Sequence, residues 1–352
     1  MKVSVPVITY NHEPYIAKAL DSILMQKTSF EFEAIIGEDC STDNTRNILI
    51  SYQKQYPNII KLLLNDKNMG AQYNARQTYG ACTGEYIASL DGDDYWTSPD
   101  KLQKQVDFLD SHPECSVCFH DALIVYEDGS NEPSHYRPSQ KEFSTVEDLL
   151  LDNYIPTCAV MYRRGLIQKT PDWFDNLKMG DWPTHILNAH YGKVGFIDET
   201  LAVYVVHPGG IWSTKNWQFR EFAIIELYET LKKHLDPKYD RIIDRFLRWK
   251  YLWVSQEFEK TNNIAEARVY LVKSIMKHLA VISRPFHHKL DPGLANDMPD
   301  YIRMERTKKL FKRYLRLFLV PFLSKYGPTV LKPRAPRLYH FLRARVSDIF
   351  KI

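Results

Sequence analysis

The chain has 352 residues, 44% of them apolar and 25% charged, which indicates a mostly globular rather than a disordered protein and suggests about two domains. The formal net charge is only +3, but it is distributed unevenly. Residues 303–352 contain fourteen Lys or Arg and two acids, a local net charge of +12, so the other 302 residues carry a net charge of −9. A basic tail on a mildly acidic body favours contact with an anionic surface.

The sequence also bears on the cellular compartment. No stretch reaches the roughly 20 apolar residues that a membrane-spanning helix needs, and the nearest, residues 315–323, is interrupted by Arg316 and Pro321. The first residues enter an apolar strand without the long apolar region of an export signal. The five cysteines are an odd number, which is typical of a reducing compartment. We therefore expect a cytoplasmic protein, whose basic tail could make a peripheral contact with the inner face of the cell membrane.

Strands and helices are predicted to alternate over the first 125 residues. Apolar runs predict strands at residues 3–9, 32–37, 59–64 and 86–90, with helices at residues 14–26, 41–56 and 71–79 between them. Ser41 is a candidate N-cap, and Pro57 ends its helix. This βαβα order predicts a parallel sheet with helices on both faces, whose ligands bind beyond the carboxyl ends of the strands.

The rest of the chain is less regular. A helix is predicted to begin near Ser98, its candidate N-cap, and a strand is predicted at residues 116–126. From about residue 217 onward, apolar residues recur at helical spacing. Cys115 and Cys118 have no second cysteine pair and no nearby histidine pair to complete a zinc site. Both are therefore expected to be small buried residues of the core.

Acidic residues follow two of the predicted strands. Glu38 and Asp39 end the second strand, and the sequence DGDD at residues 91–94 ends the fourth. Adjacent carboxylates repel one another unless they lie in solvent or are neutralised by a hard cation. Carboxylates with open positions beside them are typical of Mg²⁺ or Mn²⁺ bound to substrate phosphates. The alternative is a solvated acidic turn before the next helix.

Six segments occur in the order and spacing of a known protein family. They are VSVPVITYN at residues 3–11, DSILMQ at 21–26, GEDCSTDNT at 37–45, NMG and AR within 68–76, GEYI at 84–87 and DGDD at 91–94. Together they resemble the inverting family 2 glycosyltransferases with the GT-A fold. A weaker similarity extends through Asp181 to His207.

The resemblance implies a fold class and a domain organisation. The fold class is α/β, of the GT-A type and Rossmann-like, with a mostly parallel central sheet, helices on both faces and an α-helical C-terminal region. The GT-A domain is expected at residues 1–215, with a nucleotide-sugar half at 1–100 and an acceptor half at 101–215. A helical region is expected at 216–300, and a basic amphipathic helical tail at 301–352.

The resemblance also implies how the donor is bound. Asp39 would accept hydrogen bonds from the nucleotide base or ribose. The chain around Pro6, Thr9 and Tyr10 would line the base site. Arg76 would lie near the nucleotide, where a fixed cation favours an anionic ligand.

Metal ligands are implied in the same way. Asp91 and Asp93 form the DxD motif, in which Asp93 contacts the metal directly and Asp91 lies closer to the ribose and to metal-bound water. His207 follows another apolar strand, and some relatives use a histidine here near the metal or diphosphate; imidazole suits Mn²⁺. His12, in the first loop, is expected to be exposed at the surface.

Asp181 matches the position of the family's general base, at the start of a helix after the acceptor-side strands. An inverting transfer needs one base that deprotonates the acceptor hydroxyl as it attacks the anomeric carbon. Many family members have Glu before this Asp, whereas this chain has Gly180. The role of the base carries over, and that of the preceding Glu does not.

The function implied is a metal-dependent inverting glycosyltransferase that uses Mn²⁺ or Mg²⁺. It would move a sugar from a nucleotide-diphosphate donor, a UDP-sugar, to a hydroxyl of a glycan or lipid-linked acceptor in bacterial surface polysaccharide synthesis. One alternative is a nucleotide-sugar or glycan binding protein without turnover. Another is a nucleotidyltransferase, although residues 9–12 lack its basic Gly-rich loop. The basic tail could contact membrane or pack on the enzyme or on a second copy in a homo-oligomer; no nucleic-acid-binding motif is found.

Overall fold

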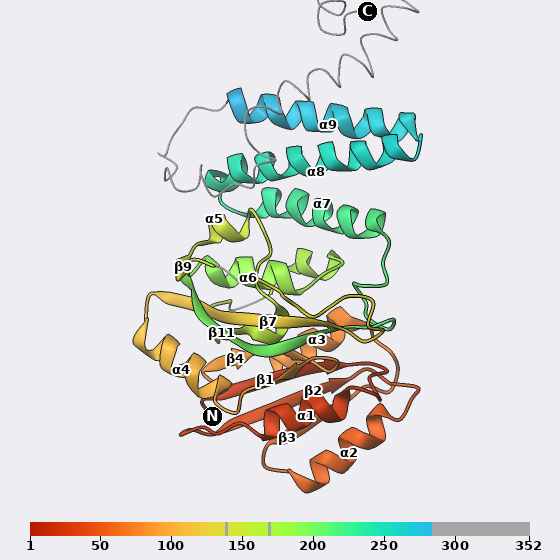
Figure 1. The fold of residues 1–352 in the computed structure, drawn as a ribbon. Coiled ribbons are helices and arrows are strands. Elements are labelled where there is room, and N and C mark those ends of the chain that lie inside the picture. The colour runs from red at the N-terminus through yellow and green to blue at the C-terminus, as the bar shows by residue number, and fades with distance from the viewer. Residues whose placement is uncertain (138–139, 168–169, 284–352) are drawn as a thin grey trace, which may run out of the picture. The chain divides into compact units, whose positions relative to one another are not determined.

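The computed structural model describes residues 1–137, 140–167 and 170–283 (Figure 1). The chain divides into two compact units, Met1–Thr230 and a second that begins at Leu231. The basic tail predicted at residues 301–352 lies outside the described residues. None of the helices within the described part of the chain is long and apolar enough to cross a membrane.

The first unit is built on one mixed sheet. Its strands are β1 (Val3–Thr9), β2 (Phe32–Glu38), β3 (Ile60–Leu64), β4 (Tyr86–Ala88), β5 (Leu90–Asp91), β6 (Tyr95–Trp96), β7 (Cys115–Tyr126), β8 (Ser134–His135), β9 (Phe143–Ser144), β10 (Val160–Arg163) and β11 (Lys193–Val206). The main path of the sheet runs β3-β2-β1-β4-β10-β7-β11-β6. Strands β3, β2, β1 and β4 are parallel, as predicted, while β10 is antiparallel to both of its neighbours.

Helices cover both faces of this sheet. They are α1 (Ile16–Leu24), α2 (Thr45–Gln55), α3 (Ala71–Gly80), α4 (Lys101–Ser111), α5 (Val146–Leu149) and α6 (Asp181–Ala189), with the 3-10 helices η1 (Thr157–Ala159) and η2 (Asp172–Asn176). Helix α7 (Trp217–His234) crosses the boundary between the units. The second unit continues with η3 (Pro237–Tyr239), α8 (Asp240–Lys260) and α9 (Ile264–Ser283). Helices α8 and α9 pack as an antiparallel pair, in which the Ser255 hydroxyl donates to the carbonyl of Ala267 at 2.7 Å.

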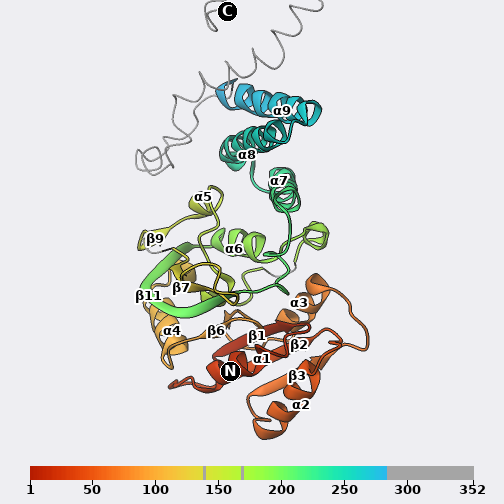
Figure 2. The same cartoon turned by 45° about the vertical axis from the view of Figure 1, so that its right-hand side comes forward.

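The order of the strands decides where the helices lie. From β1 the chain adds β2 and β3 on one side, and then places β4 on the other side of β1. Because crossovers between parallel strands are right-handed, this reversal puts α1 and α2 on one face and α3 on the opposite face (Figures 1 and 2). The carboxyl ends of β1, β2 and β5 meet at the edge beside the reversal, where ligands of such sheets bind.

Pro6 lies in the middle of β1, where a central strand normally excludes proline because proline has no N–H to donate. The neighbouring strand is interrupted at the same level: β4 ends at Ala88 and β5 begins at Leu90. Between them, the backbone N–H of Ser89 donates to Val160 on β10, at 3.3 Å. The hydrogen-bond ladder between β1 and its neighbour is therefore interrupted beside Pro6, and this interruption accommodates the proline.

A buried acid connects the amino ends of three strands through hydrogen bonds. Glu33 on β2 is fully buried, and its carboxylate accepts from the Ser4 hydroxyl at 2.6 Å, the Thr83 backbone N–H at 2.9 Å and the Lys61 ammonium at 2.6 Å. These bonds to a charged group lower the pKa of Glu33 to about 2, against the opposing effect of burial. The charge is thus compensated within the fold.

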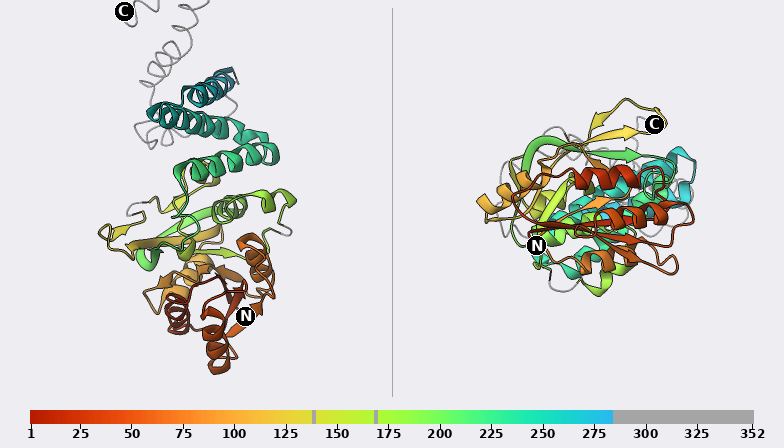
Figure 3. Two further views of the ribbon diagram at one scale, coloured as in Figure 1. Left: turned by 90° about the vertical axis from the view of Figure 1, so that its right-hand side faces the viewer. Right: turned by 90° about the horizontal axis from the view of Figure 1, so that it is seen from below.

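The long strand β11 is bent. Its register against β7 shifts between Ile197 and Ala202, and Figures 2 and 3 show the strand curving as an arc. Such bulges bend a strand and increase its twist. The bend allows β11 to pair with β9 near its beginning and with β6 near its end.

Two predicted helix caps are wrong. Helix α2 begins at Thr45 rather than after Ser41, because Asp43 accepts the Thr45 N–H at 3.0 Å and the Ser41 hydroxyl instead accepts from the backbone of Asn11 at 2.9 Å. Helix α4 begins at Lys101, and the Ser98 hydroxyl accepts from Asp100 within the preceding turn, at 3.2 Å. In both cases a tight polar turn replaces the first predicted helical turn. Cys115 and Cys118 are buried core residues, as predicted.

Candidate functional site

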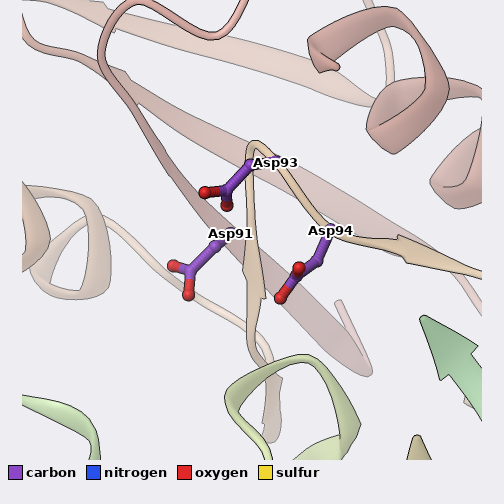
Figure 4. A group of neighbouring side chains, drawn as sticks. All are labelled: Asp91, Asp93 and Asp94. Carbon is purple, nitrogen blue, oxygen red and sulfur yellow. The ribbon is translucent and has the colours of Figure 1, made fainter. Parts of the chain in front are cut away.

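Three carboxylates gather on the turn that follows β5 (Figure 4). Asp91, Asp93 and Asp94 each offer one oxygen, and these oxygens lie within 4.8 Å of one another. The turn is fixed by its backbone, because Gly92 N–H donates to Ile8 on β1 at 3.0 Å and Asp94 N–H donates to Asp91 at 3.2 Å. The carboxyl end of β1 thereby positions the acidic cluster.

Gly92 is required by this close approach to β1. A Cβ atom at this position would lie 2.9 Å from Cβ of Thr9 and 2.8 Å from Nδ1 of His12. Such distances are shorter than side chains tolerate, so any other residue would push the turn away from the strand. The glycine between the acids is therefore a packing requirement of the site.

The cluster is electrostatically unbalanced without a cation. Burial raises the pKa of Asp91 to about 8, and the negative charges of Asp93 and Asp181 add to the effect. Burial also raises the pKa of Asp94 well above its usual value. Burial acts in the same direction on Asp93, but the hydrogen bond to His207 and the charges of His12 and His207 outweigh it, so the pKa of Asp93 is lowered.

His207 lies directly against the cluster. It follows β11 and is buried, with Nε2 placed 3.0 Å from Oδ2 of Asp93. The backbone N–H of Gly209 donates to Nδ1 at 3.2 Å and holds the ring with Nε2 toward Asp93. The ring of Tyr15 packs on the imidazole with centroids 4.3 Å apart, and the Tyr15 hydroxyl donates to Glu127 at 2.8 Å.

His12 is not the exposed residue that the sequence predicted. Its side chain is only 16% exposed, and Nε2 lies 3.6 Å from Oδ2 of Asp93. Burial lowers the pKa of His12, although the negative charge of Asp93 opposes this. The prediction was wrong because the loop after β1 folds over the acidic turn, a contact between segments 80 residues apart in sequence.

The residues present fit a hard divalent cation. Carboxylate oxygens and one imidazole are the donor set that Mn²⁺ accepts, and Mg²⁺ accepts the carboxylates. Oδ1 of Asp94 accepts from the backbone of Val205 at 2.9 Å, while Oδ2 is buried without a hydrogen-bond partner in the described part of the chain. A cation beside Asp91 and Asp93 would also reduce the repulsion between carboxylates that contributes to the raised pKa of Asp94.

Asp39 organises the loop before α3. Its carboxylate is buried and accepts from Asn65 Nδ2 at 2.9 Å, from the Met69 backbone at 2.8 Å and from the Gly70 backbone at 2.8 Å. Gly70 has a φ of 87°, which favours glycine. Asp39 N–H donates to Thr9 at 3.1 Å, so the carboxyl ends of β1 and β2 are joined beside the acidic cluster.

The other predicted donor residues are only partly brought together. Thr9 ends β1, and its hydroxyl oxygen is buried without a partner among the described residues. Tyr10 follows it and is 40% exposed. Pro6 lies three residues back along β1, about 10 Å from Thr9, and so does not reach the edge. Arg76 on α3 forms an ion pair with Asp175 of η2, and both are half-exposed.

Asp181 begins α6, and the helix predicted after it is confirmed. The segment before it approaches α3, where Gln72 Nε2 donates to the carbonyl of Leu177 at 3.4 Å. The charge of Asp181 raises the pKa of Asp91 across the site. It also contributes to the raised pKa of Tyr136, after the larger effect of burial. The electrostatic effect of Asp181 therefore reaches Asp91 in the acidic cluster.

Some residues of the site were missed by the sequence analysis. Tyr15, Gln72 and Tyr136 lie in loops or on a helix whose patterns carry no chemical signature. The one signal available was Gly92, because a glycine between acids indicates that another segment packs closely against the turn.

The chain was compared with known proteins. The model of the family described as glycosyl transferase family 2 matches residues 4–169. The putative teichuronic acid biosynthesis glycosyltransferase TuaG of Bacillus subtilis (strain 168) is 35% identical over 216 residues, which cover 60% of this chain and 82% of TuaG.

Solved structures resemble the fold. Residues 1–349 of S. aureus TarS in complex with UDP-GlcNAc align with a TM-score of 0.58 and 20% identity, covering 99% of this chain and 89% of that chain. The mannosyltransferase PcManGT from Pyrobaculum calidifontis in complex with GDP-Man and Mn²⁺ aligns with a TM-score of 0.53 and 17% identity, covering 87% and 83%. These likenesses establish a fold of the GT-A type.

Proposed function

Because the chain belongs to glycosyl transferase family 2 and is a glycosyltransferase, we propose that it transfers a sugar, with inversion, from a UDP-sugar to a hydroxyl of a glycan or lipid-linked acceptor. The observation that carries this proposal is the cluster of Asp91, Asp93 and Asp94 beside the carboxyl end of β1, with Asp181 near enough for its charge to act on Asp91. A binding protein without turnover has no need of a carboxylate beyond those that hold the donor.

A divalent cation is part of the proposal. Asp93, Asp91 and His207 would hold Mn²⁺ or Mg²⁺, which when bound neutralises charge on the diphosphate leaving group. The contacts of Asp93 support this assignment, since its Oδ2 lies 3.6 Å from Nε2 of His12 and 3.0 Å from Nε2 of His207. Mn²⁺ in the complex of the mannosyltransferase PcManGT is consistent with such a cofactor.

The nucleotide would lie over the carboxyl ends of β1 and β2. Thr9 and Tyr10 form the end of β1 there, and Arg76 supplies a cation from α3 once it leaves Asp175. Asp39 is an acceptor, and Oδ2 accepts only one hydrogen bond from the described residues, so it can take another. The free acceptor site on Oδ2 suits a base with a ring N–H, such as uracil, and the UDP-GlcNAc complex of TarS supports a uridine nucleotide.

Asp181 would act as the general base. It accepts the proton of the acceptor hydroxyl while the new bond to the anomeric carbon forms, and the bond from that carbon to the diphosphate breaks with its electron pair on the leaving group. One displacement at one centre inverts the anomer. The name of TuaG supports an acceptor in bacterial surface polysaccharide synthesis.

A panel of UDP-, GDP- and CMP-sugars tests this function. We expect release of UDP from at least one UDP-sugar in the presence of Mn²⁺ or Mg²⁺, and none when EDTA is added. Release of nucleotide that is insensitive to EDTA would contradict the metal dependence. Absence of turnover with every donor, together with tight donor binding, would support the binding protein instead.

We also propose peripheral contact with the membrane through residues 303–352. The argument is the local net charge of +12 in the sequence, because each basic residue near an anionic bilayer contributes about 1 kcal/mol. The full-length protein should bind phosphatidylglycerol vesicles and be released as salt rises. Exchange of Lys308, Lys309 and Arg313 for Gln should weaken binding, and unchanged binding would point to other contacts.

A further inference from the structure

His185 is a buried histidine without hydrogen bonds. It lies on α6, is 2% exposed, and neither ring nitrogen has a partner among the described residues. By contrast, His120 in the same unit is equally buried but has Nδ1 placed 2.8 Å from the carbonyl of Asp121. A neutral imidazole carries one donor and one acceptor, and burying both unpaired costs stability. Such a residue requires an explanation outside simple packing.

The position of His185 suggests its missing partner. It follows Asp181 by four residues on the same helix, so the two side chains lie on one face with their Cβ atoms about 6 Å apart. The Asp181 carboxylate makes no hydrogen bond with the described residues, yet its charge acts on the imidazole. Burial has the larger effect and lowers the pKa of His185 to about 4, so the ring is neutral near pH 7 and retains one N–H to donate.

The surroundings of α6 limit other uses of this imidazole. Trp182, on the adjacent face, donates its indole N–H to Leu149 at 2.9 Å and packs on Tyr228 with ring centroids 5.5 Å apart. Asn188 donates to the backbone of Thr184 at 2.9 Å. Trp182 and Asn188 are thus held by their own contacts. The imidazole of His185 lies on the same face of α6 as Asp181.

We propose that His185 is a positioning residue for Asp181: when substrate fills the site, its imidazole N–H donates to one carboxylate oxygen and aims the other at the acceptor hydroxyl. This inference rests on the proposed role of Asp181 as the base. The acceptor proton passes to the aimed oxygen of Asp181, and His185 keeps its own proton throughout. The unpaired imidazole thus destabilises the protein without substrate, and the hydrogen bond to the Asp181 carboxylate offsets this cost when substrate is bound.

The test compares His185→Leu with wild type in UDP release from UDP-GlcNAc with Mn²⁺, in which water serves as the acceptor. Leucine has a similar volume and no unpaired polar atoms, so the melting temperature should be equal or higher. We expect kcat to fall about 10- to 100-fold, the scale of a misplaced catalytic group, while KM and the Kd for UDP change less than about twofold. His185→Gln retains a donor amide and should restore most of kcat.

The matched control is His120→Leu, which removes an equally buried imidazole from β7 and should leave kcat unchanged. Wild-type kcat in His185→Leu would overturn the proposal. A loss of kcat in His185→Leu that His185→Gln does not restore would also overturn it, if His120→Leu shows the same loss of kcat together with a lower melting temperature. That pattern would mean that the buried imidazole matters only for packing. Asp181→Asn in the same assay separates the positioning role of His185 from the role of Asp181 as the general base. A slow Asp181→Asn beside a normal His185→Leu refutes only the positioning role, whereas a normal Asp181→Asn refutes the base and this inference with it.

Discussion

His207 places Nε2 3.0 Å from Oδ2 of Asp93, although the two residues are 114 positions apart in sequence. The contact joins the end of β11 to the turn after β5. Because Gly209 donates to the other ring nitrogen at 3.2 Å, the imidazole is oriented before any ligand arrives. This contact anchors the turn that carries Asp91, Asp93 and Asp94, the residues proposed to bind a divalent cation with the diphosphate.

Asp93→Asn should abolish metal-dependent donor binding. The change removes the negative charge that faces both histidines and keeps the volume of the side chain, so the fold should remain. Calorimetric titration with UDP, with and without Mn²⁺, measures the effect. Asp107→Asn, an exposed position on α4, is the control and should bind as wild type does. Equal UDP affinity of Asp93→Asn and wild type in Mn²⁺ would remove Asp93 from the metal site.

Asp181→Asn should leave donor binding intact and slow transfer by about 100-fold or more, the usual scale for the loss of a general base. An amide of the same shape cannot take up the acceptor proton. Steady-state rates and the Kd for UDP separate chemistry from binding. In the product of the wild-type enzyme, NMR should find the anomer inverted relative to the donor, and a retained anomer would refute the single displacement.

Gly92→Ala should destabilise the first unit by about 1–3 kcal/mol, the typical cost of overpacking. The new methyl group would lie 2.9 Å from Thr9 and 2.8 Å from His12. It should also weaken Mn²⁺ binding, because the turn that carries Asp91 and Asp93 must move. Gly80→Ala is the control: nothing lies within 4 Å of its Cβ, and alanine near a helix end should stabilise slightly. Urea unfolding compares the two, and equal midpoints would contradict the close packing.

The pH dependence of stability in Glu33→Gln tests the buried hydrogen bonds of Glu33. The pKa of Glu33 is depressed to about 2 in the folded state. Its contribution to stability is therefore present above the unfolded pKa of about 4.5 and is lost as pH falls toward 2. The variant should be less stable than wild type by roughly 2 kcal/mol at pH 7, and the difference should shrink by pH 2.5. Urea midpoints at the two pH values measure this, with the exposed Glu85→Gln as control; a constant difference would argue against the depressed pKa.

The sequence by itself determined the parallel sheet and the position of the acids on it. Apolar runs separated by helical spacing fix strand and helix, and right-handed connections then bring the ends of β1, β2 and β5 to one edge. Asp39, Asp91 and Asp93 follow those ends directly, so their grouping is a consequence of local pattern and topology. Asp181 at a helix start was predictable by the resemblance alone.

The tertiary structure decided which groups surround the acids. His12 and Tyr15 come from the loop before α1, whose direction depends on packing between distant segments and leaves no periodic signal in the sequence. The same applies to the ion pair of Arg76 with Asp175 and to the unpaired imidazole of His185. Burial sets the protonation of such groups, and burial is a property of the assembled fold that a linear pattern does not contain.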